Sequence, residues 1–291
     1  MASFIPSEIS VGSLHGLLLS SVAPRPIAFA STIDAKGRPN LSPFSFFNVF
    51  SANPPVMIFS PARRVRDNTT KHTLTNVEEV EEVVINVVNF DIVQQMSLSS
   101  TEYPDGVNEF EKAGLTMLES DIVRPFRVAE SPVQFECKVT DIIKLGTEGG
   151  AGNLVICEVL KMHVADEVLN AEGQINQEAL DLVARAGGSY YSRANKGFFE
   201  IPKPLRTLGI GVDAMPEFVR DSMILTGNDL GMLGNVEQLP STEEVQKFIE
   251  THTDVHKIIQ SGDQENIHKK AQEYLVKQNV NNAWKVLLAT L

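Results

Sequence analysis

The sequence predicts a mostly β protein with some helix, in which a barrel is followed by a helical C-terminal extension. Two observations favour the barrel: at least six stretches have strand character, and few helices separate them. The third observation is a change after about residue 205, where apolar residues recur at helical spacing. We therefore expect a β domain over residues 1–205 and a helical extension over residues 206–291.

The predicted strands follow from alternation of apolar residues with small or polar ones. Strands are expected at Ile27–Ile33, Asn40–Phe44, Val56–Ser60, Glu82–Asn89, Val133–Leu145 and Leu154–Val164. Gly-containing turns at 34–39 and 146–152 are expected to join neighbouring strands into antiparallel pairs. The segment 45–53, rich in Ser, Asn and Phe, is expected to be a loop.

Short helices are expected between these strands and throughout the last third. They lie at Ser13–Ser21, at Asn76–Glu82, from Asp91 to Leu98, and from Asn108 to Gly114. Ser241 and Glu244 have the spacing of a capping box, and the apolar stripes that follow are expected to be packing surfaces. The Gly-rich segment Thr226–Asn235 lacks the dinucleotide fingerprint and is expected to be a structural turn or a pocket lid.

Composition and charge limit the classes of partner. The 291 residues, 43% of them hydrophobic, suffice for one sizeable core and a smaller appendage. The net charge of −12 repels phosphate backbones and anionic membranes, so neither nucleic acid nor a membrane is expected as a partner. The apolar run Leu17–Leu19 is far too short for a signal-peptide core, and we expect a cytoplasmic protein. Cys137 and Cys157 lie in apolar runs and are expected to be buried free thiols.

The segment from Pro24 to Ser60, with the basic loop after it, has the residue types that a flat ligand with a phosphate requires. FMN, the flavin mononucleotide, is such a ligand. Small polar residues suit the edge of its ring and its sugar chain, and phenylalanines suit the ring faces. A cation before a helix suits the phosphate. The candidates are Ser31, Thr32, Ser42, Ser45, Asn48, Phe44, Phe46, Phe47, Arg63, Arg64, Arg66, Lys71 and Thr73. Each alone also fits a turn, a solvated loop or a core position.

The order of five motifs resembles a known family. A-P-R-P-I-A-F-A-S-T is followed by N-L-S-P-F-S-F-F-N, N-P-P-V-M-I-F-S, K-H-T-L-T-N-V and V-V-I-N-V-V. This order is similar to that of flavin reductase-like proteins, including the flavoredoxin-like ones. The resemblance covers roughly Phe4 to Ser192. It implies an FMN-binding split β-barrel of Greek-key type, a homodimer with FMN near the subunit interface, and NADH or NADPH as the electron donor.

The resemblance also assigns residues to the parts of FMN. It implies that Ser31 and Thr32 lie beside the flavin, that Ser45, Phe46 and Asn48 lie along the ring and sugar, and that Lys71 and Thr73 bind the phosphate, with Ser60 as a weaker addition and Arg185–Tyr190 near the pocket. One departure is His72, which stands where such motifs often carry Asp. No catalytic acid or base is assigned, and the six scattered histidines give no reason to expect a metal site.

The function that this resemblance implies is an FMN-binding oxidoreductase that passes electrons from NADH or NADPH through FMN to an acceptor. One alternative is a flavin-binding carrier or electron-transfer module without its own reductase activity. Another is an interaction protein whose barrel is a platform for the helical extension. A third is an oxidase of the pyridoxamine phosphate type, although P-R-P-I and K-H-T-L-T-N favour the flavin reductase-like branch.

Overall fold

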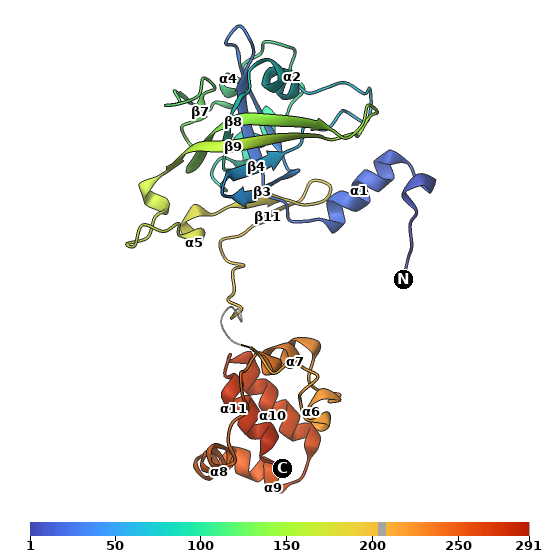
Figure 1. The fold of residues 1–291 in the computed structure, drawn as a ribbon, viewed down its shortest axis with the longest axis vertical. Coiled ribbons are helices and arrows are strands. Elements are labelled where there is room, and N and C mark those ends of the chain that lie inside the picture. Colours follow the sequence, from blue (N-terminus) through green and yellow to red (C-terminus); the bar gives the residue numbers. More distant parts are fainter. Residues whose placement is uncertain (203–207, 291) are drawn as a thin grey trace. The chain divides into compact units, whose positions relative to one another are not determined.

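The computed structural model describes residues 1–202 and 208–290. The chain forms two compact units, Met1–Phe199 and Glu200–Leu291. Figure 1 shows a β-rich first unit and an all-helical second one. The domain boundary expected between residues 205 and 206 lies outside the described residues.

A seven-stranded antiparallel sheet forms the body of the first unit, in the order β2-β1-β5-β8-β9-β4-β3. Its strands are β1 (Ala28–Ile33), β2 (Pro39–Phe44), β3 (Phe47–Ala52), β4 (Pro55–Phe59), β5 (Glu82–Asn86), β8 (Val133–Lys144) and β9 (Asn153–Val164). The edge strands β2 and β3 are consecutive in the chain and are joined by Ser45 and Phe46 alone. This connection reaches at most about 11 Å, because consecutive Cα atoms are about 3.8 Å apart. The sheet must therefore curl until its two edges approach each other, as the predicted barrel requires.

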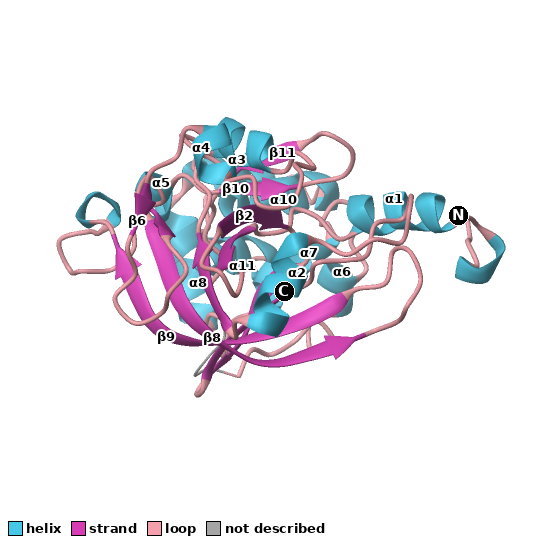
Figure 2. Cartoon of the chain, turned by 90° about the horizontal axis from the view of Figure 1, so that it is seen from above, coloured by secondary structure: helices cyan, strands magenta, loops and turns pink. Residues whose placement is uncertain are grey.

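Smaller elements surround this sheet (Figure 2). The helices are α1 (Val11–Ser21), α2 (His72–Glu79), α3 (Val93–Ser99), α4 (Glu109–Ala113) and α5 (Gln177–Leu180), with 3-10 turns at Pro6–Glu8 and Asp166–Val168. Two small hairpins are formed by β6 (Met117–Leu118) with β7 (Arg127–Val128), and by β10 (Val183–Arg185) with β11 (Tyr191–Arg193). Figures 1 and 2 both show α1 projecting from the body of this unit.

Two apolar clusters hold the sheet in place. One contains Ala28 and Ala30 of β1 and is closed by Leu74 and Val77 of α2. The other contains Phe29 and the side chains of α3 and α4. All six residues of β1 are buried. Both faces of the strand, the one with Ala28 and Ala30 and the one with Phe29, are therefore covered, as the predicted alternation requires.

Several local predictions are wrong. The expected loop at 45–53 contains the strand β3, because its backbone pairs with β4 while most of its side chains stay half or fully exposed at the sheet edge. The helix predicted at Asn76–Glu82 begins four residues earlier, at His72, because Leu74 and Val77 are drawn into the core. Helix α3 starts after Ile92 with no side-chain cap among the described residues, so the expected cap at Asp91 does not form.

Other local predictions are confirmed. Asn108 caps α4 by accepting a hydrogen bond from the Phe110 amide, and Gly114 ends the helix at φ 65°. That left-handed conformation suits glycine because it has no Cβ. Cys137 and Cys157 are buried free thiols.

The second unit is built from α6 (Glu217–Arg220), α7 (Gly227–Gly234), α8 (Thr242–Thr251), α9 (Thr253–Gln260), α10 (Gln264–Val276) and α11 (Val280–Leu288). The expected packing stripes form its core around Trp284, whose Nε1–H donates to the Leu233 carbonyl oxygen over 3.0 Å. The capping box of Ser241 and Glu244 is confirmed. The turn or lid expected at Thr226–Asn235 is instead mostly the helix α7, because Thr226 and Asp229 form a second capping box. Within the described ranges, no helix is long and apolar enough to cross a bilayer.

Candidate functional site

A pocket lies where the loop after β4 enters α2. It is lined by Asn40, Ser42, Arg64, Lys71, His72, Thr73, Glu109 and the segment 99–103. The fold thus brings together the β2 strand, the start of α2, and the end of α3 with the loop after it. Three of the predicted phosphate residues, Arg64, Lys71 and Thr73, line this one pocket, together with Ser42.

Lys71 is placed to attract an anion. It is the N-cap residue of α2, and no side chain in the described structure caps this helix end. The first-turn amides of a helix lack intrahelical acceptors and favour negative charge. The ammonium group is half-buried, and burial together with the charge of Arg64 lowers the pKa of Lys71, whereas Glu102 acts in the opposite direction. No carboxylate of the described chain lies within ion-pair distance of this lysine.

A buried network of polar side chains supports this pocket. Thr73 Oγ1 donates to Asn40 Oδ1 over 2.8 Å, and Asn40 Nδ2 donates to Glu109 Oε1 over 3.0 Å. Thr32 joins the network because its Oγ1 donates to Asn40 Oδ1 over 3.5 Å, and it also accepts a hydrogen bond of 3.0 Å from Asn76 Nδ2. The structure therefore brings Thr32 and Thr73 together through amide side chains that were not among the predicted site residues.

Glu109 carries the one buried charge of this network. Burial raises the pKa of Glu109, and hydrogen bonds from the Leu41 amide and from Asn40 oppose that rise. Both carboxylate oxygens are occupied, since Oε2 accepts from the Leu41 amide over 3.0 Å. The carboxylate fixes β2 to α4 and thereby the wall of the pocket.

Ser31 is not brought to the same surface as Thr32. Neighbouring residues of a strand point to opposite faces of a sheet, and both residues are fully buried. The Ser31 hydroxyl has no hydrogen-bond partner among the described residues. The predicted pair therefore separates into a networked threonine and an isolated serine.

Three other predicted residues, Ser45, Phe46 and Ser60, lie together where the two edges of the sheet approach each other. We call these three residues the seam. The Ser60 amide donates to the Phe46 carbonyl oxygen over 2.8 Å. The Ser60 hydroxyl accepts a hydrogen bond of 3.0 Å from the Asn153 amide, which fixes the start of β9. Asn48 stands apart, exposed on β3, and its Oδ1 accepts from the Val49 amide over 2.8 Å.

Arg25 organises the seam and was not predicted as a site residue. Its guanidinium is buried, donates to the Val22 carbonyl oxygen over 2.6 Å, and approaches the Ser45 hydroxyl at 3.5 Å. Burial, with the nearby charge of Arg185, lowers the pKa of Arg25. The two flanking prolines in P-R-P were the sequence signal for a fixed arginine at this position.

The segment Arg185–Tyr190 lies against this same arginine. Arg25 and Arg185 exchange backbone hydrogen bonds of 2.9 and 2.8 Å. A Cβ atom at Gly187 would come within 2.3 Å of the Ser20 hydroxyl oxygen, so glycine permits this loop to approach α1. The loop therefore lies beside the seam. It does not line the pocket with Arg64 and Lys71, which we call the cationic pocket.

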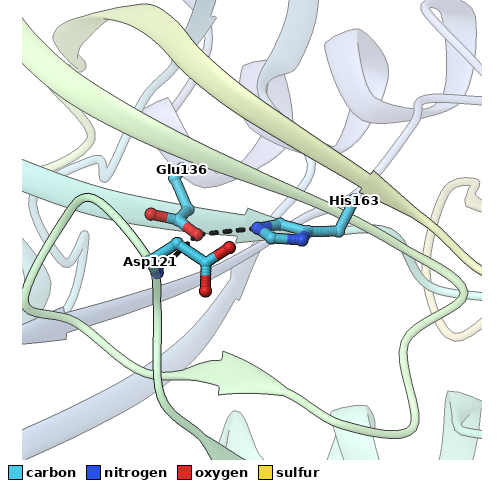
Figure 3. Close-up of side chains that lie close together, drawn as sticks. All are labelled: Asp121, Glu136 and His163. Carbon is cyan, nitrogen blue, oxygen red and sulfur yellow. Dashed lines mark hydrogen bonds and ion pairs between the residues drawn. The ribbon is translucent and has the colours of Figure 1, made fainter.

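Among the described residues, one cluster has the ligand types of a metal site: Asp121, Glu136 and His163 (Figure 3). Its ligand atoms are already engaged. Glu136 accepts from the Asp121 amide over 2.9 Å, from the Ile122 and Val123 amides, and from His163 Nε2 over 2.7 Å. Asp121 pairs with Lys161. This arrangement is that of a structural ion-pair network.

Comparison with known proteins agrees with the fold and the order of motifs. The flavin reductase like domain matches residues 19–186. A protein of Aquifex aeolicus is 38% identical over 191 residues, which are 66% of this chain and 95% of that protein. Nitrilotriacetate monooxygenase component B from Bacillus cereus is 30% identical, with a TM-score of 0.64 over 69% of this chain and 98% of that chain.

A further solved structure carries the name of the fold. A Shewanella frigidimarina protein with a split barrel domain is 26% identical, with a TM-score of 0.59 over 70% of this chain and all of that one (100%). The curled antiparallel sheet described above corresponds to that domain. The chain therefore belongs to the flavin reductase-like family, with a split barrel followed by C-terminal helices.

Proposed function

We propose that this protein is an FMN-dependent oxidoreductase that takes electrons from NADH or NADPH and delivers them through FMN to an acceptor. The observation that carries the proposal is the cationic pocket at the uncapped start of α2, lined by Lys71, Arg64 and Thr73. Membership of the flavin reductase-like family supports the choice of a flavin.

The residues of the pocket fit the phosphate of FMN. A phosphate monoester carries close to two negative charges and accepts several hydrogen bonds. The pocket offers the Lys71 ammonium and a guanidinium, with the free amides of a helix start beside them. Since the whole chain has a net charge of −12, this local cluster is what would hold a dianion against the global field.

For the ring and the sugar chain we propose the residues that the family resemblance implies: Ser31, Thr32, Ser45, Phe46, Asn48 and Ser60. Phe46 supports this assignment because its side chain is 39% exposed beside the pocket-forming strand β2. Ser60 is proposed to position Phe46 through its backbone amide, which donates to the Phe46 carbonyl oxygen. Its hydroxyl is engaged with the Asn153 amide.

The side chains have binding and orienting roles in this proposal. When bound, FMN supplies the redox chemistry that amino-acid side chains lack. Lys71 would anchor the phosphate through its ammonium group and Thr73 through its backbone amide, since the Thr73 hydroxyl is engaged with Asn40. The seam residues would orient the ring. Because hydride transfer between nicotinamide and flavin needs no proton from the protein, we assign no catalytic acid or base.

We also propose a homodimer in which the partner chain covers α1 and β3. Helix α1 has no buried residue within the described part of the chain, although Leu17 and Leu18 are apolar. The β3 residues Val49 and Phe50 are 62% and 64% exposed. Exposed apolar surface of this kind marks interaction sites. The His15 ring of α1 packs edge-on against the Phe46 ring, with the ring centroids 6.3 Å apart. The exposed apolar surface of α1 is therefore continuous with the proposed flavin site.

Lys71→Ala provides the test of the phosphate assignment. Loss of one charge-assisted contact is expected to weaken FMN binding by about 1.5–3 kcal/mol, or roughly 10- to 150-fold. Titration of the purified protein followed by flavin fluorescence measures this effect. Lys36→Ala, which removes an exposed lysine of the β1–β2 turn, is the matched control. Equal FMN affinity in the Lys71 variant and the wild type would assign the phosphate to another cation.

Reductase activity is tested separately from flavin binding. The flavin-loaded protein is mixed anaerobically with NADH or NADPH, and the visible absorbance of the flavin is followed. Rapid bleaching with either donor supports the oxidoreductase. Stable flavin binding without bleaching would leave the carrier module as the function, and absence of any flavin binding would overturn both.

A further inference from the structure

An acidic side chain occupies the cationic pocket. Glu102, in the loop between α3 and α4, lines the pocket together with Lys71. Its Oε1 accepts from Arg64 Nε over 3.0 Å, and its Oε2 accepts from Arg66 Nη2 over 2.8 Å. Both carboxylate oxygens therefore lie on cations that belong to the loop before α2.

Arg64 is held in place independently of this carboxylate. Its Nη1 donates to Thr69 Oγ1 over 2.8 Å and to the Thr70 carbonyl oxygen over 2.6 Å. Its backbone amide also bonds to the Thr69 carbonyl oxygen over 2.9 Å, and its side chain is only 16% exposed. The guanidinium is thus a preformed anion site that does not depend on Glu102 for its position.

Glu102 is less firmly fixed than its partner. Its side chain is 44% exposed, and the second arginine, Arg66, is 72% exposed. Hydrogen bonds from Arg66, opposed by burial and aided by Arg64, lower the pKa of Glu102, so the group is a carboxylate at neutral pH. Ion pairs with this exposure contribute little to stability and are readily exchanged.

We propose that Glu102 is a specificity-determining residue that competes with the flavin phosphate for Arg64 and Arg66. The inference rests on the proposed function. In the absence of phosphate, the Glu102 carboxylate neutralises the two arginines. A phosphate bound beside Lys71 is repelled by this carboxylate unless it displaces the carboxylate from the arginines. Glu102 therefore lowers the affinity for FMN but has no effect on a flavin without phosphate.

The test compares FMN with riboflavin, which has the same ring and sugar chain but no phosphate. Glu102→Gln keeps the shape of the side chain and removes its charge. We expect FMN to bind about twofold to fivefold more tightly to this variant, since one exposed ion-pair competitor is removed. Riboflavin affinity is expected to stay unchanged, and so is the FMN affinity of Glu81→Gln, a variant with the same change of net charge at an exposed site outside the pocket.

Three outcomes would overturn the inference. Equal FMN affinity in Glu102→Gln and wild type would show that the carboxylate does not compete. Weaker FMN binding would show that it positions the arginines instead. An equal change for FMN and riboflavin would show that it only orders its loop. A wild-type protein that binds neither flavin would refute the proposed function itself, which separates the two failures.

Discussion

At the scale of single residues, the hydroxyl groups of β1 and α2 differ in what they stabilise. Thr73 and Thr32 are joined to amide side chains in a buried network. Ser31 is equally buried, but its hydroxyl has no partner among the described residues. A buried polar group without a hydrogen bond costs free energy, whereas removing one partner of a satisfied pair leaves the other unsatisfied.

Ser31→Ala and Thr73→Val therefore have opposite expected effects on stability. The Ser31 variant is expected to keep its free energy of unfolding within about 0.5 kcal/mol of the wild type, or to gain stability. The Thr73 variant is expected to lose about 1–3 kcal/mol, because Asn40 loses its donor. Urea unfolding measures both. A loss above about 1 kcal/mol in Ser31→Ala would show that this hydroxyl has a partner.

The same serine variant also bears on the flavin site. If Ser31 contacts the ring as proposed, Ser31→Ala weakens binding of both FMN and riboflavin, since the ring is common to them. Unchanged affinity for both would remove Ser31 from the proposed set. Thr32 would then be the contact from this part of β1.

At the scale of elements, Glu136 attaches the segment after β6 to the strand β8. The fully buried carboxylate accepts hydrogen bonds from the Asp121 amide and from His163 (Figure 3). It also accepts hydrogen bonds from the amides of Ile122 and Val123. Burial alone would raise the pKa of Glu136, but these hydrogen bonds outweigh it and hold the pKa below its usual value. Glu82 holds the next residue of the segment, since its Oε2 accepts hydrogen bonds of 3.0 Å from the amide and from Nε of Arg124, but this carboxylate is partly exposed.

Glu136→Gln is expected to lower the free energy of unfolding by about 2–3 kcal/mol at neutral pH, since charged hydrogen bonds are lost at a buried site. The native pKa of Glu136 is depressed, so its stabilising contribution is present above the unfolded pKa of about 4.3 and is lost as pH falls through the native pKa. The difference between variant and wild type should therefore shrink below about pH 4. Urea unfolding at several pH values measures it, with Glu81→Gln as control. A difference that is independent of pH would contradict the assigned role of the charge.

The predicted elements were correct where the local signal and the tertiary contacts agree. The β8–β9 pair was predictable because its two long apolar runs flank one Gly-rich turn. Strand β3 was missed because Asn48 and Ser51 have low strand preference, and only pairing with β4 stabilises them in that conformation. Helix α7 was missed because its glycines conceal a capping box between Thr226 and Asp229.

At the scale of the whole molecule, the exposed apolar residues of α1 and β3 suggest that the functional unit contains two chains. A helix with no buried residue in the described chain gains little from packing and needs another surface to stabilise it. The family match ends at residue 186, before the helical unit begins. Its core around Trp284 is separate from that of the barrel.

The expected particle has twice the 32.0 kDa mass of one chain. Light scattering after size-exclusion chromatography measures this mass. Leu18→Asp and Phe50→Asp, which place a charge on α1 and β3, are expected to shift the particle to one chain and to weaken FMN binding at the adjoining seam. Val276→Asp is the control, because Val276 lies on the second unit and is 78% exposed. A wild-type protein that is monomeric at micromolar concentration would contradict the proposal.

The sequence by itself determined the fold class and the family, because these depend on motif order and strand periodicity along the chain. It predicted Lys71 before a helix, and Lys71 is the N-cap residue of α2, because a cation before a helix is a local signal; phosphate binding by Lys71 and Thr73 stays a prediction. Only the tertiary structure decided that Thr32 joins Thr73 through Asn40, that Ser31 faces the other way, and that Glu102 enters the cationic pocket. These contacts join segments far apart in the chain, and their geometry is set by sheet register and by the path of a loop, which residue types alone do not specify.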